Sequence, residues 1–273
     1  AGTEEGAKEF IVPARKFEGG YYALPQSPQQ YKQMLICSGY DKYFQIARCF
    51  RDEDSRGDRQ PEFTQFDLEM AFASMQDIIS LNTTLFNELV STVYGSKWKL
   101  FPFRVITYKE AMLKYGSDRP DLRFGLEMND ITDIVSKTSF NVFAVPIKNG
   151  GIVKCIKVDK SSKRNDLTRT QIENLTELAK QYGLGGLAYI MLNKGELQST
   201  IIKYFGESIC KEIIVKMKAV DGDVVFLSAA TPKIANRALD AVRQELGKIL
   251  GLIKSRELHP AWIVDFPQFE KTD

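Results

Sequence analysis

The chain has 273 residues, of which 44% are hydrophobic and 26% charged, and its formal net charge is +2. This length fits one large domain or two ordinary ones, and the composition is that of a globular protein rather than a fibrous or low-complexity one. A charge this close to zero gives no sign of a broadly basic surface, so any contact with a nucleic acid has to be local. No run of about 18 apolar residues is present to predict a membrane span.

The four cysteines predict no disulfide framework and no metal site. Cys37, Cys49, Cys155 and Cys210 are widely spaced, and no two of them form a CxxC pair. They are typical of reduced packing thiols in a cytosolic protein, and an organellar matrix would suit them equally.

The first third of the chain predicts short strands, a helix and a hairpin. Residues 9–13 and 20–25 are expected to form two short strands. A helix is expected to follow, capped by Ser27, with Pro28 in its first turn, Leu35 and Ile36 on its buried side, and its end near Gly39.

Two apolar runs with alternating polarity, residues 43–50 and 63–70, predict an antiparallel hairpin. The charged loop between them contains Gly57 and Pro61 as turn residues. Arg51 and Glu53 are two residues apart and therefore point to one face. Four residues of the returning strand also share a face: Phe63, Gln65, Asp67 and Glu69. Spacing alone leaves two interpretations open, a solvated face or the floor of a ligand site.

The remaining elements alternate between helix and strand. Helices are predicted at residues 76–94 and 107–115, the second capped by Thr107, and residues 117–123 mark a boundary. Beyond it we expect strands at 140–147 and 152–158 around a turn at residues 149–151, then a strand at 186–192, a helix at 201–217, a strand at 224–228 and a helix at 235–250. A helix at 168–182 is expected to begin with a capping box of Thr170 and Glu173. A strand at 262–266 is expected to return to the first domain's sheet.

The hairpin carries a pattern that resembles a known family. The hairpin contains FRDE at residues 50–53, followed by a loop and RQPEFTQ at 59–65. This pattern is similar to the second signature motif of class II aminoacyl-tRNA synthetases, in the form found in the bacterial-type aspartyl enzymes. QSPQ at 26–29 and TEEGA at 3–7 resemble two further elements of those enzymes. The resemblance extends from Thr3 to the segment at 262–267.

The resemblance implies an α+β fold, in which an antiparallel-sheet catalytic core of the class II type carries an inserted α+β domain. The expected divisions are residues 1–121 for the core, 122–254 for the inserted domain of the bacterial enzymes, and 255–273 for the return to the core. We also expect this chain to be a segment, with the family's first motif, its dimer interface, before Ala1 and the third motif after Asp273. Such a segment is expected to be inactive alone.

The implied activity is ATP-dependent ligation of L-aspartate to tRNA(Asp) through aspartyl-adenylate, by an enzyme that is a homodimer at full length. Charging of tRNA(Asn) as well remains open. Two alternatives are a relative that forms aspartyl-adenylate without tRNA and a non-catalytic RNA-binding relative. The second would be expected to have lost Arg51, Lys32 or Asp67, and all three are present.

The resemblance assigns five residues to ATP: Arg51, Asp52, Glu53, Gln60 and Phe63. Arg51 is the expected catalytic residue at the α-phosphate, because a guanidinium is always charged and donates two parallel hydrogen bonds. Phe63 would stack on adenine, although a core position would also explain it. Mg²⁺ is expected to bridge the phosphates, held largely by water and nucleotide oxygens, with no metal ligand assigned in this chain.

Aspartate is assigned six residues by the same resemblance: Glu5, Ser27, Gln29, Lys32, Arg51 and Asp67. Asp67 and Gln29 would meet its ammonium group, with Ser27 and Glu5 nearby. Lys32 would meet its side-chain carboxylate, and Lys32 lies one helical turn from Gln29 on the same face. Without the motif, Lys32 would be interpreted as an ordinary exposed helix lysine. The single histidine, His259, lies outside every motif and is expected to be structural or exposed.

Overall fold

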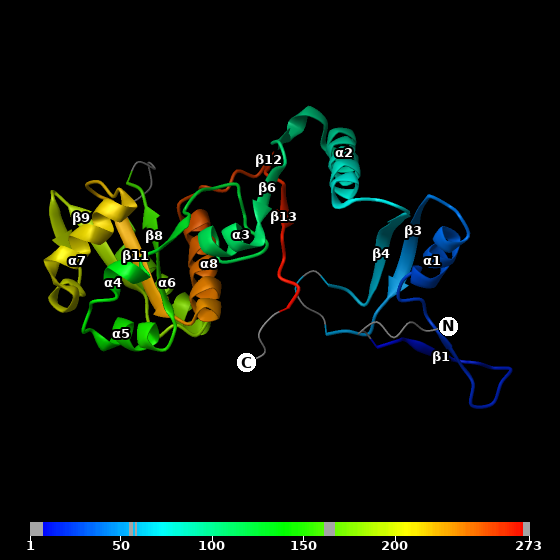
Figure 1. The fold of residues 1–273 in the computed structure, drawn as a ribbon, viewed down its shortest axis with the longest axis horizontal. Coiled ribbons are helices and arrows are strands. Elements are labelled where there is room, and N and C mark those ends of the chain that lie inside the picture. The colour runs from blue at the N-terminus through cyan, green and yellow to red at the C-terminus, as the bar shows by residue number, and fades with distance from the viewer. Residues whose placement is uncertain (1–7, 55–56, 58, 161–166, 270–273) are drawn as a thin grey trace. The chain divides into compact units, whose positions relative to one another are not determined.

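The computed structural model describes residues 8–54, 57, 59–160 and 167–269 (Figure 1). The chain divides into two compact units between Thr84 and Leu85, inside helix α2 (Met75–Tyr94). Among the described residues no helix is both long and apolar enough to cross a membrane.

The first unit is built around the predicted hairpin. Strands β3 (Lys42–Phe50) and β4 (Glu62–Met70) pair antiparallel, with Gln45 opposite Asp67 and Cys49 opposite Phe63. Before them, β1 (Ile11–Pro13) and β2 (Tyr21–Ala23) form a small antiparallel ribbon. The pairing of β3 with β4 confirms the expectation from alternating polarity, and β1 and β2 lie within the two short strands expected at residues 9–13 and 20–25.

Helix α1 (Gln29–Cys37) packs on the hairpin, and its start differs from the prediction. The residue before the helix is Pro28, and no side chain caps the helix, so the expectation that Ser27 is the cap is wrong. The predicted end is confirmed at Gly39, whose φ of +96° is the left-handed conformation that terminates helices. Lys32, rather than Leu35 or Ile36, is the buried residue of this helix.

The two faces of the hairpin differ in their surroundings. Phe63, Gln65 and Asp67 are buried or half-buried on one face, where Lys32 of α1 also lies. On the other face, the side chains of Phe44, Ile46 and Phe66 are exposed. The hairpin therefore has one sheltered polar face, which carries the site described below.

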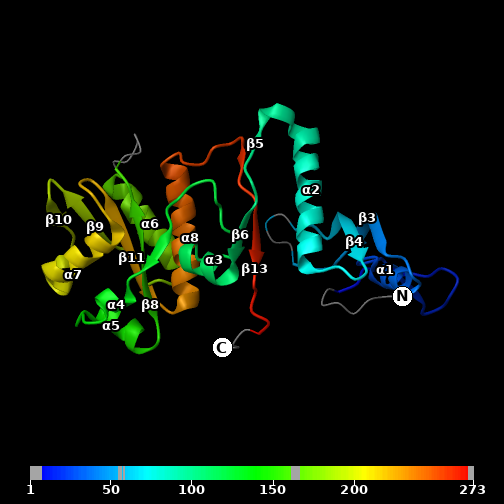
Figure 2. The same ribbon diagram turned by 45° about the horizontal axis from the view of Figure 1, so that its top comes forward.

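The second unit contains a five-stranded antiparallel sheet with helices on both faces (Figures 1 and 2). In spatial order its strands are β10 (Glu196–Gln198), β9 (Ala188–Asn193), β11 (Val224–Ala230), β8 (Ile152–Val158) and β7 (Met128–Asp130).

Two hydrophobic cores lie on the two faces of this sheet. Phe226 and Ile156 face helices α6 (Arg169–Gln181) and α8 (Pro232–Ile249). Leu227 and Cys155 point to the opposite core, because neighbouring strand residues alternate between faces. The helices of that face are α4 (Thr132–Val135), α5 (Asn141–Lys148) and α7 (Ile202–Met217).

Two local predictions in this unit are wrong. Residues 140–147 form helix α5 rather than a strand, and Gly150, at φ +76°, follows the end of that helix instead of joining a hairpin. A short apolar run suits a strand and a buried helix equally, and here Phe140, Phe143 and Ile147 meet the core at helical spacing. The capping box is formed by Thr168 and Gln171, two residues before the predicted pair.

The C-terminal strands pair with strands from before the sheet. β12 (Glu257–Leu258) pairs parallel with β5 (Lys99–Leu100), and β13 (Ala261–Val264) pairs parallel with β6 (Arg104–Thr107). A short 3₁₀ turn (Gly95–Lys97) precedes β5. The ring of His259 stacks on that of Phe101, with 3.9 Å between the ring centroids, which suits the structural role expected for it.

Helix α3 (Tyr108–Lys114) follows β6, and the predicted cap is confirmed because Thr107 Oγ1 accepts a hydrogen bond from the backbone N–H of Glu110 at 3.1 Å. A small core joins this helix to β6 and β13. Its buried members are Ile106, Ala111, Tyr115 and Leu122.

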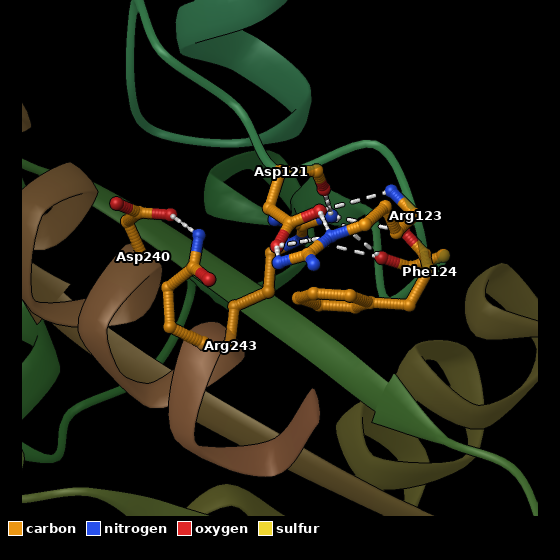
Figure 3. A network of polar contacts seen from close by, with 7 residues as sticks. Asp121, Arg123, Phe124, Asp240 and Arg243 are labelled. Atoms are coloured by element: carbon orange, nitrogen blue, oxygen red, sulfur yellow. Dashed lines mark hydrogen bonds and ion pairs between the residues drawn. The ribbon is translucent and has the colours of Figure 1, made fainter. Parts of the chain in front are cut away.

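Two buried cations connect this region to the sheet. Arg243 of α8 is fully buried and donates to the carbonyl oxygens of Asp121, Phe124 and Gly125, at 2.6 to 3.2 Å (Figure 3). Its guanidinium carbon lies 4.3 Å from the ring centroid of Phe124 and 4.9 Å from that of Tyr115.

Lys154 of β8 makes the second connection. Its Nζ donates to the carbonyl oxygens of Met112 and Leu113, at 2.8 and 2.9 Å, and to Asn236 Oδ1 at 2.7 Å. Both carbonyls belong to the last turn of α3, where the helix dipole favours a positive charge. These two side chains tie α3 and residues 121–125 to α8 and β8.

Candidate active site

The sheltered face of the hairpin contains a buried lysine between two carboxylates. Lys32 Nζ lies 3.0 Å from Asp67 Oδ1 and 3.3 Å from Glu69 Oε2. The side chain of Asp67 is 5% exposed and that of Glu69 is 36% exposed. Burial lowers the pKa of Lys32, but the hydrogen bonds and charges of the two carboxylates outweigh it, and the net shift is upward. The lysine is therefore held in its charged form.

One oxygen of Asp67 is not used by this arrangement. Asp67 Oδ1 accepts hydrogen bonds from Lys32 and, at 3.3 Å, from Gln65 Nε2, whereas Oδ2 is buried and has no hydrogen-bond partner among the described residues. Leaving a buried carboxylate oxygen unpaired costs about 1–3 kcal/mol. A ligand that supplies a cationic N–H donor would recover that free energy.

Nearby side chains respond to the charge of Asp67. Tyr43 lies opposite Glu69 in the hairpin, and burial together with the Asp67 charge raises the pKa of its hydroxyl. Burial also raises the pKa of the Cys49 thiol, which donates to Gln65 Oε1 at 3.5 Å. Both groups stay neutral at pH 7 and add no charge to the cluster. The formal charges of Lys32, Asp67 and Glu69 sum to −1.

A second unsatisfied group lies at the start of α1. Ser27 Oγ is buried and has no hydrogen-bond partner among the described residues. Because Ser27 does not cap the helix, its hydroxyl remains available to a ligand. Gln29, predicted to assist Asp67, is half-buried one helical turn from Lys32 on α1.

The other predicted half of the site lies at the loop end of the hairpin, where β3 ends and β4 begins. The Arg51 guanidinium lies over the ring of Phe63, 5.2 Å from its centroid, and Arg51 Nε donates to the carbonyl oxygen of Gln26 at 3.4 Å. This carbonyl belongs to the residue before Ser27. The hydrogen bond therefore connects Arg51, predicted to bind the nucleotide, to the segment that contains Ser27, predicted to bind the amino acid. Gln60 and Phe63 line a shallow open hollow together with Pro61.

Three predicted residues have less direct placements. Glu53 pairs with Arg59 at 3.6 Å, and the backbone N–H of Asp52 bonds the carbonyl oxygen of Lys8 at 3.0 Å. Glu5, together with the TEEGA element, lies outside the described residues. No cluster of three or more potential metal ligands is present in the described ranges.

The prediction placed Glu69 and Gln65 on the floor but omitted them from the set of site residues. The structure places Glu69 on Lys32 and Gln65 on Asp67. Their positions two residues to either side of Asp67 were the available signal, since strand residues at that spacing share a face.

The arrangement fits a ligand with both signs of charge. The unpaired carboxylate oxygen of Asp67 suits a cationic group of a ligand, the buried lysine attracts a carboxylate, and the arginine beside an aromatic ring suits a phosphate and a flat base. This combination is typical of a site that activates an amino acid with a nucleotide.

Comparison with known proteins identifies the family. The model of "tRNA synthetases class II (D, K and N)" matches residues 1–272. The chain belongs to this family. Its mixed α/β architecture is that of a class II synthetase-like fold.

The curated relatives agree with this class II assignment. The chain is 48% identical over 268 residues to the aspartate–tRNA(Asp/Asn) ligase of Hydrogenobaculum sp. (strain Y04AAS1), and 46% identical over 266 residues to the aspartate–tRNA ligase of Clostridium novyi (strain NT). These alignments cover 98% and 97% of this chain and 44% of each relative. The chain thus spans less than half the length of the curated relatives it matches.

A solved structure with a similar chain is the asparaginyl-tRNA synthetase of Entamoeba histolytica in complex with asparaginyl-adenylate. The two share 12% sequence identity and a TM-score of 0.31, over 89% of this chain and 58% of that one.

Proposed function

We propose that the protein ligates L-aspartate to tRNA in two steps, first forming aspartyl-adenylate from aspartate and ATP. The observation that carries this proposal is the pairing of Lys32 with Asp67, whose second carboxylate oxygen is buried and has no partner in the part of the chain that the structure describes. The substrate's ammonium group would bind that oxygen, and its side-chain carboxylate would bind Lys32. The names of the curated relatives support aspartate as the amino acid.

Discrimination against asparagine follows from the charge of Lys32. An asparagine side chain carries no charge, so it would leave the buried lysine without its additional anionic partner. The lost charge-assisted hydrogen bond is worth about 1.5–3 kcal/mol, or roughly a 10- to 100-fold loss in efficiency.

Adenylate formation needs positioning and charge stabilisation rather than a covalent enzyme intermediate. In the proposed reaction the α-carboxylate of aspartate attacks the α-phosphorus of ATP, and pyrophosphate leaves with the electron pair of the broken P–O bond. Arg51 would bind the α-phosphate oxygens and stabilise the charge that develops on them. Phe63 would stack on adenine, with Glu53, Asp52 and Gln60 as further nucleotide contacts.

Mg²⁺ is expected to accompany the phosphates, but the described residues offer no preformed set of ligands for it. The tRNA substrate is proposed as tRNA(Asp), with tRNA(Asn) as a second acceptor, since the relatives' names include both narrower and broader specificities.

The proposal extends to the domain organisation. Residues 122–254 would be the inserted domain of bacterial-type aspartyl enzymes, flanked by catalytic-core residues 1–121 and 255–273, in a homodimer. The separate sheet with its two cores, and the pairing of β12 and β13 with β5 and β6, support these boundaries. The two-unit division at Thr84 falls elsewhere, so the boundaries remain a prediction.

Aspartate-dependent exchange of radiolabelled pyrophosphate into ATP, measured on the full-length protein, tests the first step. We expect exchange with aspartate and at least tenfold less with asparagine. Absence of aspartate-dependent exchange would overturn the proposal and favour a non-catalytic relative. Charging assays with tRNA(Asp) and tRNA(Asn) test the second step, and exchange without charging of either would identify an enzyme that uses the adenylate differently.

A further inference from the structure

Glu69 has no role in the proposed function, yet it contacts the residue that recognises the substrate's carboxylate. Its Oε2 lies 3.3 Å from Lys32 Nζ, and among the described residues Asp67 is the other carboxylate in contact with that ammonium group. Lys32 comes from α1 and both carboxylates come from β4, two residues apart. The lysine therefore bridges two neighbouring positions of a single strand.

The two carboxylates differ in what else they can bind. Asp67 is almost fully buried, and its Oδ1 is shared between Lys32 and Gln65 while its Oδ2 is unpartnered. Glu69 is partly exposed, and Lys32 is its ion-pair partner. Asp67 can thus meet a ligand's cation from within the site, whereas Glu69 is placed to bind the lysine from the rim.

Charge balance then assigns different tasks to the two acids. Two carboxylates and one lysine leave one negative charge unpaired, and the ammonium group of an amino acid would neutralise it. When that ammonium binds Asp67, the negative charge of Asp67 is shared between two cations, and its hold on Lys32 weakens. A second carboxylate on Lys32 keeps the lysine charged and in place at that moment.

We propose that Glu69 is a positioning residue for substrate recognition: it holds Lys32 on the hairpin floor and thereby leaves Asp67 available for the ammonium group of the amino acid. This inference rests on the proposed function, because it assumes that Lys32 and Asp67 bind aspartate. It adds a residue that touches neither substrate and acts through the lysine.

The test is Glu69→Gln, which keeps the size of the side chain and removes its charge. We expect the KM for aspartate in pyrophosphate exchange to rise about tenfold, while the KM for ATP changes less than about twofold and kcat less than about threefold. A matched control is Glu173→Gln on α6, because Glu173 forms an exposed ion pair of similar length, 2.9 Å to Arg169, away from the hairpin residues. The control should leave all three constants unchanged.

The pH dependence separates positioning from a general structural effect. Three titratable groups on β3 and β4 influence or contact Lys32: Tyr43, Asp67 and Glu69. Removing the charge of Glu69 removes one of the contacts that raise the pKa of Lys32, so the alkaline limb of kcat/KM for aspartate should move to lower pH. A protein that was merely loosened would show a lower melting temperature without that displacement.

The outcomes distinguish the inference from the function it rests on. Wild-type protein without aspartate-dependent exchange would overturn the proposed function itself. Normal wild-type exchange together with an unchanged aspartate KM in Glu69→Gln would overturn only the role of Glu69. Glu69→Asp, which retains the charge on a shorter side chain, should recover part of the lost affinity, and equal defects in Glu69→Asp and Glu69→Gln would also overturn it.

Discussion

The two units of the chain bury positive charge in different ways. In the first unit, Lys32 is met by two carboxylates, and one buried carboxylate oxygen remains unpaired. In the second unit, Arg243 is met by backbone carbonyls, and the three donors of Lys154 are met by two backbone carbonyls and the side-chain carbonyl of Asn236. Carbonyl oxygens carry no net charge, so they fix a side chain in place without leaving a surplus of anion.

We call the contacts of Arg243 and Lys154 the structural joint, and the proposed function makes the Lys32 cluster a binding site. A surplus negative charge in a sheltered place is costly until a ligand neutralises it, so on this proposal the Lys32 cluster responds to substrate. Each of the three donors of Lys154 has a partner in its own unit, and Arg243 donates from Nε and Nη2 to backbone carbonyls, although its buried Nη1 has no partner among the described residues. We therefore expect changes at the first cluster to alter kinetics and changes at the second to alter stability.

The largest effect is expected from Arg243→Leu. The substitution leaves the buried carbonyl oxygens of Asp121, Phe124 and Gly125 without their donor, and the free energy of unfolding should fall by about 4 kcal/mol. Urea unfolding monitored by circular dichroism measures this, with exposed Arg237→Leu on the same helix as the control. A loss below about 1 kcal/mol would contradict a structural role for Arg243.

The next effect is expected from Arg51→Ala. Loss of a charge-assisted contact to the α-phosphate should slow pyrophosphate exchange at least about 100-fold, equivalent to roughly 3 kcal/mol in the transition state. Arg15→Ala is the control, since Arg15 is an exposed arginine of the same unit, between β1 and β2. Near-normal exchange by Arg51→Ala would exclude the phosphate role.

Lys32→Met should affect recognition of the amino acid more than that of the nucleotide. The buried ammonium group is lost, so the KM for aspartate should rise about 30-fold, or about 2 kcal/mol, while the KM for ATP changes little. Exposed Lys42→Met at the start of β3 is the control. Equal increases in both Michaelis constants would show that Lys32 is not specific to the amino acid.

The sequence predicted those features of the Lys32 cluster that depend on residues close together in the chain. Alternating polarity predicted the pairing of β3 with β4, and the two-residue spacing put Asp67 and Glu69 on one face. The contact between Lys32 and Glu69 could not be predicted, because it depends on how α1 packs on the hairpin. The cap assigned to Ser27 was wrong for a related reason: Ser27 has the right residue type, but α1 begins after Pro28.

The structural joint had no signal in the sequence. Arg243 lies on a helix whose hydrophobic stripe was predicted, but its partners are carbonyls of residues 121–125, more than 115 positions away. Backbone acceptors look alike at every residue, so no side-chain pattern identifies them. Residues 140–147 show the same limit at short range, because only the tertiary core decided between strand and helix for that apolar run.

The smallest expected effect is a pH dependence of stability that comes from Lys154. Burial lowers the pKa of Lys154 to about 8 from its ordinary value of 10.5. Between these two values the unfolded chain binds more protons than the folded one, so this residue makes stability rise with pH. Relative to Lys154→Met, the wild-type free energy of unfolding should gain about 1 kcal/mol between pH 7.5 and pH 9.

Lys157, on the same strand as Lys154, provides the control for this prediction. Its hydrogen bond to Asp159, at 2.7 Å, is the main cause of a raised pKa, so its contribution to stability is lost only as the pH rises above its ordinary value of 10.5. Lys157→Met should therefore keep the wild-type slope between pH 7.5 and pH 9, whereas Lys154→Met should flatten it. Equal slopes in wild type and Lys154→Met would mean that the carbonyl contacts stabilise the charged lysine as well as water does. Such a result would mean that cations held by carbonyls and a cation held by carboxylates do not differ in how their environment shifts the pKa.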